Sequence, residues 1–354
     1  MSAHHNLSTR HSEVAMNNKS KIILFAIAVL LSMSAYVSLY FYQFGRGVLA
    51  EWWLLNVTQK KIQIAESHKG KRVFIVAGSS GIFGFNSDII TERTGFDVIN
   101  MSMHAGLDLS YYRMIIEKTV RGGDTVIMPL EFSYYRRADE YTGWFVDNIM
   151  AWGSDYLKWN TIWKNVEFFS HVSLSRVVTG LVSPIKHNYD SLEKVMAFSN
   201  PSGTYNGYSY KSLNARGDIN RFNFMHWSVK ELIDQHDKNR GTLSYGNGNV
   251  TITSHTMREL LKIKNLVESR GALLYISWPT TMQTKYFNPD NAGAKMLVGD
   301  VKEQLSEKGF KFLCDPFYAN LPQFYFLDTY YHLNGDGAKI RSERFSQCLN
   351  DEMK

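Results

Sequence analysis

The sequence predicts an α/β fold: a three-layer α/β/α sandwich around a five-stranded parallel sheet, preceded by one transmembrane helix. Three observations predict it. An uncharged apolar segment of spanning length lies near the N-terminus, short buried strands alternate with helices from residue 72 to 132, and the same alternation returns after residue 250. Closely spaced βαβ units make the strands parallel, with helices on both faces of the sheet.

The composition is that of a folded protein. Of 354 residues, 44% are hydrophobic and 20% are charged, a balance that argues against a disordered chain. The formal net charge of +6 permits attraction to anionic lipids or acidic polymers. The chain has no dense Lys/Arg stripe and no nucleic-acid-binding motif, so we expect no nucleic-acid partner. Its 11 His residues form no metal-binding motif, and we expect no metal and no cofactor.

The segment 22–43 is predicted to be the transmembrane anchor. It reads IILFAIAVLLSMSAYVSLYFYQ and carries no charge, and about 20 apolar residues span a bilayer as a helix. Lys19 and Lys21 precede it, so the positive-inside rule places the tail 1–21 in the cytoplasm. The rest of the chain is then extracytoplasmic.

A cleaved signal peptide is the alternative to an anchor, with Ser32 to Ser34 as a weak small-residue cleavage site. Apolar and aromatic residues continue beyond this site, which favours the uncleaved anchor. Residues 44–70 then form an amphipathic connector, and its Trp52 and Trp53 are expected near the outer membrane interface.

The extracytoplasmic domain is expected to span residues 71–354 and to begin with three parallel strands. These are RVFIVAG (72–78), FDVINMS (96–102) and DTVIMPLEF (124–132), and the first and third are continuous apolar runs typical of buried parallel strands. A helix over 109–121 connects the second strand to the third.

Two further helix–strand pairs and a last helix complete the predicted sheet. They are helix 256–270, strand 272–278, helix 293–308, strand 310–316 and a final helix from about 335. Between the two halves, residues 136–250 show no clean alternation and are interpreted as an insertion or cap. Its tryptophans suit either core packing or stacking on sugar rings: Trp144, Trp152, Trp159 and Trp163.

The two cysteines, Cys314 and Cys348, are too far apart in sequence for a CxxC motif. In an exported domain they can form a disulfide between the last strand and the last helix. The alternative is two buried thiols that act as small hydrophobic side chains.

The ends of the first two strands offer the first candidate residues, because ligands bind outside the carboxyl ends of strands in open α/β sheets. The turn GSSG (78–81) places Ser80 at a helix start, which suits a nucleophile whose reaction forms an oxyanion. A merely tight or phosphate-binding turn is the alternative. After the second strand, Gly106 can bring its N–H beside Ser80, and His104 is either a contributor or a packing residue.

The segment FLDTYYHLN (326–334), just before the final helix, supplies a carboxylate and an imidazole four residues apart. His332 is the candidate base that takes the proton of Ser80 and returns it, and Asp328 is the candidate group that orients the ring. The alternative is that Asp328 caps a turn and His332 packs under the helix.

Together, GSSGIFG, Gly106 and the C-terminal DTYYHLNGDGAKIRSERF resemble the SGNH (GDSL-type) hydrolase superfamily over most of residues 72–349, apart from the insertion. The resemblance implies a flavodoxin-like sheet, Ser80 as nucleophile, His332 and Asp328 as its partners, and Gly106 as an oxyanion-hole residue. It extends to the membrane-anchored branch that contains the D-alanyl transfer protein of teichoic-acid synthesis and the O-acetylation proteins of bacterial exopolysaccharide and peptidoglycan.

The chain departs from the family pattern at three positions. Ser79 stands where the family has Asp, so either serine of the turn is a candidate nucleophile, with Ser80 favoured by position. Asp328 lies four residues before His332 rather than three. The third strand ends in Glu131 where the family supplies an Asn donor to the oxyanion; Glu131 is left as a substrate contact, a partner contact or a structural residue.

The function that the resemblance implies is O-acetylation of a cell-envelope or exopolysaccharide by an extracytoplasmic acyltransferase of the bacterial inner membrane. Acetyl-CoA is cytoplasmic, so the acyl donor has to be delivered across the membrane, and the implied partner is a multi-spanning protein of the membrane-bound O-acyltransferase type. The same residues would serve a polysaccharide deacetylase or esterase. A non-enzymatic scaffold of a polysaccharide assembly complex is the third hypothesis.

Overall fold

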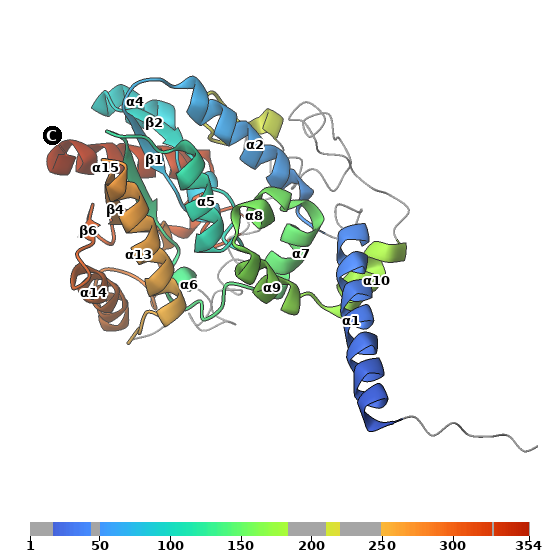
Figure 1. The fold of residues 1–354 in the computed structure, drawn as a ribbon. Helices are drawn as coiled ribbons and strands as arrows, with labels where there is room; N and C mark the ends of the chain where they lie inside the picture. The colour runs from blue at the N-terminus through green and yellow to red at the C-terminus, as the bar shows by residue number, and fades with distance from the viewer. Residues whose placement is uncertain (1–16, 44–49, 183–209, 220–248, 328, 354) are drawn as a thin grey trace, which may run out of the picture.

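A five-stranded parallel sheet forms the centre of the protein (Figure 1). The computed structural model describes residues 17–43, 50–182, 210–219, 249–327 and 329–353. The strand order is β2-β1-β3-β4-β6, the order of flavodoxin-like doubly wound sheets, in which the direction of winding changes between β1 and β3. The strands are β1 (Arg72–Ile75), β2 (Asp97–Asn100), β3 (Thr125–Pro129), β4 (Leu273–Ser277) and β6 (Lys311–Phe312). The predicted α/β fold with five parallel strands is confirmed.

Helices cover both faces of this sheet, because successive side chains of each buried strand point to opposite faces. On one face, Val73 and Ile75 of β1 pack with Phe345 of the last helix. On the other face, Phe74 packs in the larger core that includes Ile263. The helices of the first face are α4 (Ser87–Thr94) and α15 (Gly335–Met353), and those of the second are α2 (Trp52–Ser67), α5 (Leu109–Thr119), α13 (Ser254–Ser269) and α14 (Ala292–Ser306).

Local sequence explains where several of these helices begin and end. Asn86 accepts hydrogen bonds from the first N–H groups of α4, and Asp108 does the same for α5. Gly95 ends α4 with a φ of 77°, a conformation that favours glycine. Asn86 and Asp108 thereby fix the ends of the two loops that follow β1 and β2, and both loops lie at one edge of the sheet.

The segment interpreted as an insertion contributes short helices and one strip of chain. They are α7 (Gly143–Trp152), α8 (Ser154–Trp159), α9 (Ile162–Ser170), α10 (Leu174–Val182) and the 3₁₀ turn η2 (Tyr210–Ser212). The short helix α6 (Phe132–Tyr135) precedes the insertion, shortly after β3. The strip ends at the buried Asp218, whose carboxylate accepts from Ser87 and from Asn100 at the end of β2. The insertion therefore packs on the same core as the sheet.

A long apolar helix precedes the domain. It is α1 (Asn18–Gln43), and it is long and apolar enough to cross a membrane. One face of its last turn is buried, since Tyr40 and Gln43 pack against the domain, while Phe41, Tyr42 and most of the helix are exposed. Trp52 and Trp53 were expected near the membrane interface, but they lie buried in the protein core at the start of α2. The reason is that α2 is amphipathic and packs its apolar face on the sheet.

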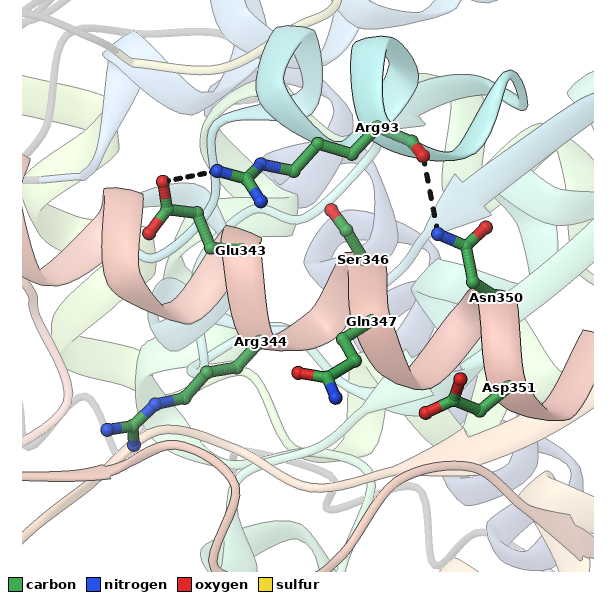
Figure 2. A pocket seen from close by; sticks show the side chains of 7 residues that line it. All are labelled: Arg93, Glu343, Arg344, Ser346, Gln347, Asn350 and Asp351. Carbon is green, nitrogen blue, oxygen red and sulfur yellow. Dashed lines mark hydrogen bonds and ion pairs between the residues drawn. The ribbon is translucent and has the colours of Figure 1, made fainter.

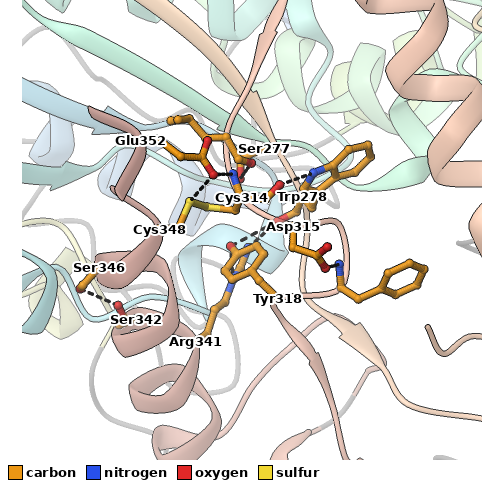
Figure 3. Close-up of a disulfide and its surroundings, with 12 residues drawn as sticks. Ser277, Trp278, Cys314, Asp315, Tyr318, Arg341, Ser342, Ser346, Cys348 and Glu352 are labelled. Atoms are coloured by element: carbon orange, nitrogen blue, oxygen red, sulfur yellow. Dashed lines mark hydrogen bonds between the residues drawn. A yellow bond between two sulfur atoms is a disulfide. The ribbon is translucent and has the colours of Figure 1, made fainter. Parts of the chain in front are cut away.

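A second, small sheet and a disulfide close the C-terminal half. The sheet pairs β5 (Thr281–Met282) with β7 (Asn320–Leu321), next to the 3₁₀ turn η3 (Gln323–Tyr325), and none of these was predicted. Cys314, just after β6, is bonded to Cys348 of α15 (Figure 3). Of the two alternatives for the cysteines, the structure has the disulfide.

Candidate functional site

The turn after β1 lies at the switch point of the sheet and is enclosed by its neighbours. Gly78 has no room for a side chain, because a Cβ there would lie 2.7 Å from the Cα of Ala105 and 2.6 Å from a Glu131 oxygen. Gly81 also has no room for a side chain, because a Cβ there would overlap the side chain of Ser102. The loops that follow β1, β2 and β3 thus meet at this turn, as expected for the carboxyl ends of neighbouring parallel strands.

Ser80 is fully buried at the start of the short helix α3 (Ser79–Ile82). Its backbone carbonyl accepts from Nη1 of Arg341 at 2.5 Å. Its hydroxyl Oγ is enclosed and has no hydrogen-bond partner among the residues that the structure describes. Ser79, the other serine of the turn, is half-buried. A buried, unpaired hydroxyl costs free energy, which makes Ser80 the more unusual of the two.

Glu131 holds the turn from the end of β3. Its carboxylate accepts from the N–H of Ser80 at 2.7 Å and from the N–H of Gly78 at 3.1 Å, and the side chain is fully buried. Burial raises the pKa of Glu131, and the two N–H groups together with Arg341 act in the opposite direction. The sequence left Glu131 as a substrate contact, a partner contact or a structural residue. Its contacts in this structure are those of a structural residue. It also occupies the Ser80 N–H, a donor that an oxyanion at this serine would need.

The loop after β2 contains His104 and Gly106. The N–H of Gly106 donates to Nδ1 of His104 at 2.9 Å, and the imidazole stacks on Trp144 with ring centroids 4.5 Å apart. Burial lowers the pKa of His104 to about 4, with the charges of His332 and Arg137 adding to the effect. The ring is therefore neutral at pH 7, and because Nδ1 accepts, the proton is assigned to Nε2. The Gly106 N–H is engaged within its own loop.

The loop before α15 brings His332 to the same end of the sheet. It folds as a narrow hairpin, with a bridge between Phe326 and Leu333 and a hydrogen bond from Leu327 N–H to the His332 carbonyl. The His332 side chain is buried and packs on Phe83, with ring centroids 4.6 Å apart. Asp328 lies outside the residues that the structure describes.

The remaining contacts tie this hairpin to the third strand end. The hydroxyl of Tyr331 accepts from the N–H of Phe132, directly after Glu131. Phe83, which touches His332, is three residues beyond Ser80. Ser80 and His332 thus lie at one end of the sheet, on adjoining segments, but the Ser80 hydroxyl is not hydrogen-bonded to the His332 ring in this structure.

Sequence reasoning missed Arg341, which touches the turn more directly than any other basic residue that the structure describes. It is fully buried, donates to the carbonyls of Ser80 and Trp278, and lies over the ring of Phe85 with its Cζ 3.8 Å from the centroid. The signal was present in the sequence. Arg341 stands on the apolar stripe of α15, whose other members are Ala338, Phe345 and Leu349, and an unpaired arginine is rare on such a stripe.

An open pocket of about 460 Å³ lies elsewhere, between α4 and α15 (Figure 2). Arg93 and Glu343 form an ion pair of 2.7 Å across it, and Asn350 donates to the Arg93 carbonyl. Arg93 is four residues before β2, so the pocket is at the amino-terminal end of the strands, opposite the Ser80 turn. Its open, polar lining at this end of the sheet makes it a surface groove rather than part of the site.

Comparisons with known proteins add little to this geometry. No family model and no curated protein matches the chain. Among solved structures, the crystal structure of protein YxiM from Bacillus subtilis is similar with a TM-score of 0.37 and 9% sequence identity. The match covers 80% of this chain and 57% of that one. This chain therefore spans a little over half the length of that protein, and a likeness of this size carries no argument about function.

Proposed function

We propose that the protein is a membrane-anchored SGNH-type acyltransferase that O-acetylates a cell-envelope polysaccharide or exopolysaccharide. Ser80 is the nucleophile, His332 the base, and Asp328 the group that orients the imidazole. The observation that carries the proposal is the meeting of the 78–81 turn with the C-terminal hairpin: Phe83 contacts His332, and Arg341 holds the Ser80 carbonyl. These segments are some 250 residues apart in sequence.

The proposed chemistry proceeds in two balanced steps. In the first, Ser80 Oγ attacks the acyl carbonyl of the donor, His332 takes the hydroxyl proton, and the donor's leaving group departs with that proton. In the second, a sugar hydroxyl gives its proton to His332 and attacks the acyl-serine. Ser80 leaves, recovers the proton, and the acyl group is then on the sugar. Acyl donation by a multi-spanning partner of the membrane-bound O-acyltransferase type supplies the first step.

The present hydrogen bonds set a requirement on this chemistry. The N–H groups of Ser80 and Gly106, which would stabilise the oxyanion, are engaged by Glu131 and His104. Both N–H groups have to exchange these partners for the substrate oxygen, and the buried hydroxyl of Ser80 has to become accessible. We therefore expect slow reaction with generic esters, and faster reaction when the proper donor and acceptor are bound.

Two features support an extracytoplasmic polymer as the substrate. The Cys314–Cys348 disulfide is typical of proteins folded outside the cytoplasm. Trp144, half-buried beside Gly106 on the His104 ring, provides an aromatic surface at the rim of the site that suits stacking on a sugar.

Covalent labelling tests the nucleophile. The purified full chain would be incubated with a fluorophosphonate probe, digested, and mapped by mass spectrometry. Labelling on the peptide that contains Ser80, absent in Ser80→Ala and retained in Ser79→Ala, is the expected result. Labelling at Ser79 would keep the class and change the residue.

Transfer is tested in cells. Ser80→Ala should abolish acylation of the polymer at unchanged protein level, whereas Ser79→Ala should retain it. A mass-tagged acyl donor with excess sugar acceptor then separates transfer from hydrolysis, because the tag ends on the sugar in the first case and as free acid in the second.

A non-enzymatic scaffold is the second candidate, and a specific observation favours it. Ser80 is fully buried and its N–H is already capped by Glu131, which is the arrangement of a structural turn. A scaffold predicts that polymer acylation persists in Ser80→Ala cells. Loss of acylation at normal protein level removes this candidate.

A further inference from the structure

Two helices of the insertion carry apolar side chains that are exposed among the residues that the structure describes. Trp163 of α9 is 79% exposed, an unusual state for a tryptophan. Five further apolar side chains are each at least half exposed: Ile162, Val166, Leu174, Val178 and Val182. On α10 they recur every four residues, which places them on one face of the helix.

The exposed faces adjoin the end of α1. Phe169 lies on the same face of α9 as Ile162 and Val166, and its ring contacts Tyr40 and Phe41 of α1 at centroid distances of 5.3 and 6.0 Å. The apolar stripe of α9 therefore continues directly onto the predicted membrane span. Figure 1 shows α9 and α10 on the side of the domain where α1 leaves it.

The second helix, α10, is held against α1 by a hydrogen bond and by a close contact at a glycine. Nη1 of Arg176 donates to Oε1 of Gln43 at 2.8 Å. Gly180 faces the same residue, and a Cβ there would lie 2.5 Å from the Gln43 oxygen, so glycine permits the close approach. This packing uses one face of α10 and leaves Leu174, Val178 and Val182 pointing away from the domain.

The charges of the two helices lie off the apolar stripes. Lys164 is paired with Glu167 at 2.8 Å and with Glu140 at 3.1 Å, and Arg176 is buried. These are the only basic residues of α9 and α10. A surface without free positive charge attaches to a bilayer by inserting apolar side chains rather than by attraction to anionic headgroups.

We propose that α9 and α10 lie on the surface of the lipid bilayer beside the end of α1, with their exposed apolar side chains in the boundary between headgroups and acyl chains. Tryptophan prefers this boundary, and short amphipathic helices with one apolar face bind there. The domain is thereby attached at three helices, which holds its orientation to the membrane fixed. The proposal uses α1 as a membrane span and is independent of the acyltransferase activity.

Spin labels in the full-length protein test the proposal. Val166→Cys, Val178→Cys and the control Met296→Cys, an exposed apolar position of α14, would each be nitroxide-labelled in phosphatidylcholine nanodiscs, with the native disulfide left oxidised. The accessibility of each label to oxygen and to a water-soluble nickel complex is then compared. The oxygen-to-nickel ratio should be several-fold higher at positions 166 and 178 than at 296.

Two results would overturn it. Labels at 166 and 178 that are as accessible to nickel as the label at 296 mean that the stripes face water. Labels shielded from both reagents mean that protein covers them. A readout on the unlabelled chain is tryptophan fluorescence quenching by dibrominated lipid. The quenched fraction of the emission should fall in Trp163→Phe and should not fall in Trp159→Phe, whose indole N–H is bonded to Glu117 within the domain.

Discussion

The environment of Ser80 is set by two side chains that are far from each other in the sequence. Glu131 binds its N–H and Arg341 binds its carbonyl, so both backbone groups of one residue are held by charged partners. Hydrogen bonds to charged groups are about twice as strong as those between neutral groups. These bonds hold the turn in the conformation seen here, and the Ser80 N–H has to leave Glu131 before the buried hydroxyl can react as proposed.

Arg341→Met tests how far α15 supports this turn. The substitution keeps an unbranched apolar stem but removes the guanidinium. The buried carbonyl of Ser80 then loses its donor, and the Trp278 carbonyl keeps only the Tyr318 hydroxyl, so the free energy of unfolding should fall by about 3 kcal/mol. Urea denaturation of the full chain in detergent measures it. Arg344→Met is the matched control: Arg344 lies on the same helix and makes one exposed bond to the Tyr318 carbonyl, and its loss should matter much less. An equal loss of stability in the two variants would contradict the inference that Arg341 supports the Ser80 turn.

His104 predicts a pH dependence of stability. Its pKa is about 4 in the folded protein and about 6.5 in an unfolded chain. Between these values the unfolded chain binds the proton and the folded protein does not, so stability is complete above pH 6.5 and falls as the pH decreases toward 4, by about 3 kcal/mol in all. The melting temperature of His104→Gln should decrease less over this range than that of the wild type. Parallel pH profiles for the two proteins would show that His104 does not contribute.

At the scale of elements, the site depends on the carboxyl ends of β1, β2 and β3 meeting at the switch point of the sheet. The first and third of these strands were predictable because RVFIVAG and DTVIMPLEF are apolar runs, and the second, FDVINMS, because it follows a helical stretch between them. The small sheet of β5 and β7 was not. Two-residue strands carry no periodicity, and only the fold around Thr281 and Asn320 brings them into register.

The disulfide is the strongest single link between two elements of the C-terminal half. It closes a loop between Cys314 and Cys348, which are 34 positions apart, and joins the end of β6 to α15. Constraint of the unfolded chain by a loop of this length is worth about 4 kcal/mol. Reduction should lower the midpoint of urea unfolding of the wild type by a corresponding amount, and should leave the Cys314→Ser/Cys348→Ser double variant unchanged. A wild type insensitive to reductant would contradict the link.

At the scale of the whole molecule, charge and redox chemistry predict on which side of the membrane the domain lies. Lys19 and Lys21 lie in the first turn of α1, before its apolar segment, which favours a cytoplasmic N-terminus, and the disulfide favours an oxidising compartment for the domain. A C-terminal alkaline phosphatase fusion in bacterial cells should therefore be active, and a C-terminal green fluorescent protein fusion dark. The opposite pattern would place the domain in the cytoplasm and exclude an extracytoplasmic substrate.

The sequence by itself determined the parts of this protein that depend on local order. Hydrophobic runs, glycine stops and helical spacing are read along the chain, and they predicted the apolar helix α1, the five parallel strands and the helices between them. They also predicted that Ser80 stands at a strand end, since that position depends only on the turn that follows β1.

Only the tertiary structure decided which partners these residues have. That Glu131 caps the turn, that Arg341 reaches it from the last helix, and that Trp52 is buried in the core all depend on packing between segments distant in sequence. Periodicity along the chain indicates which face of a helix is buried. The partners that this face meets are selected by the fit of side chains in three dimensions.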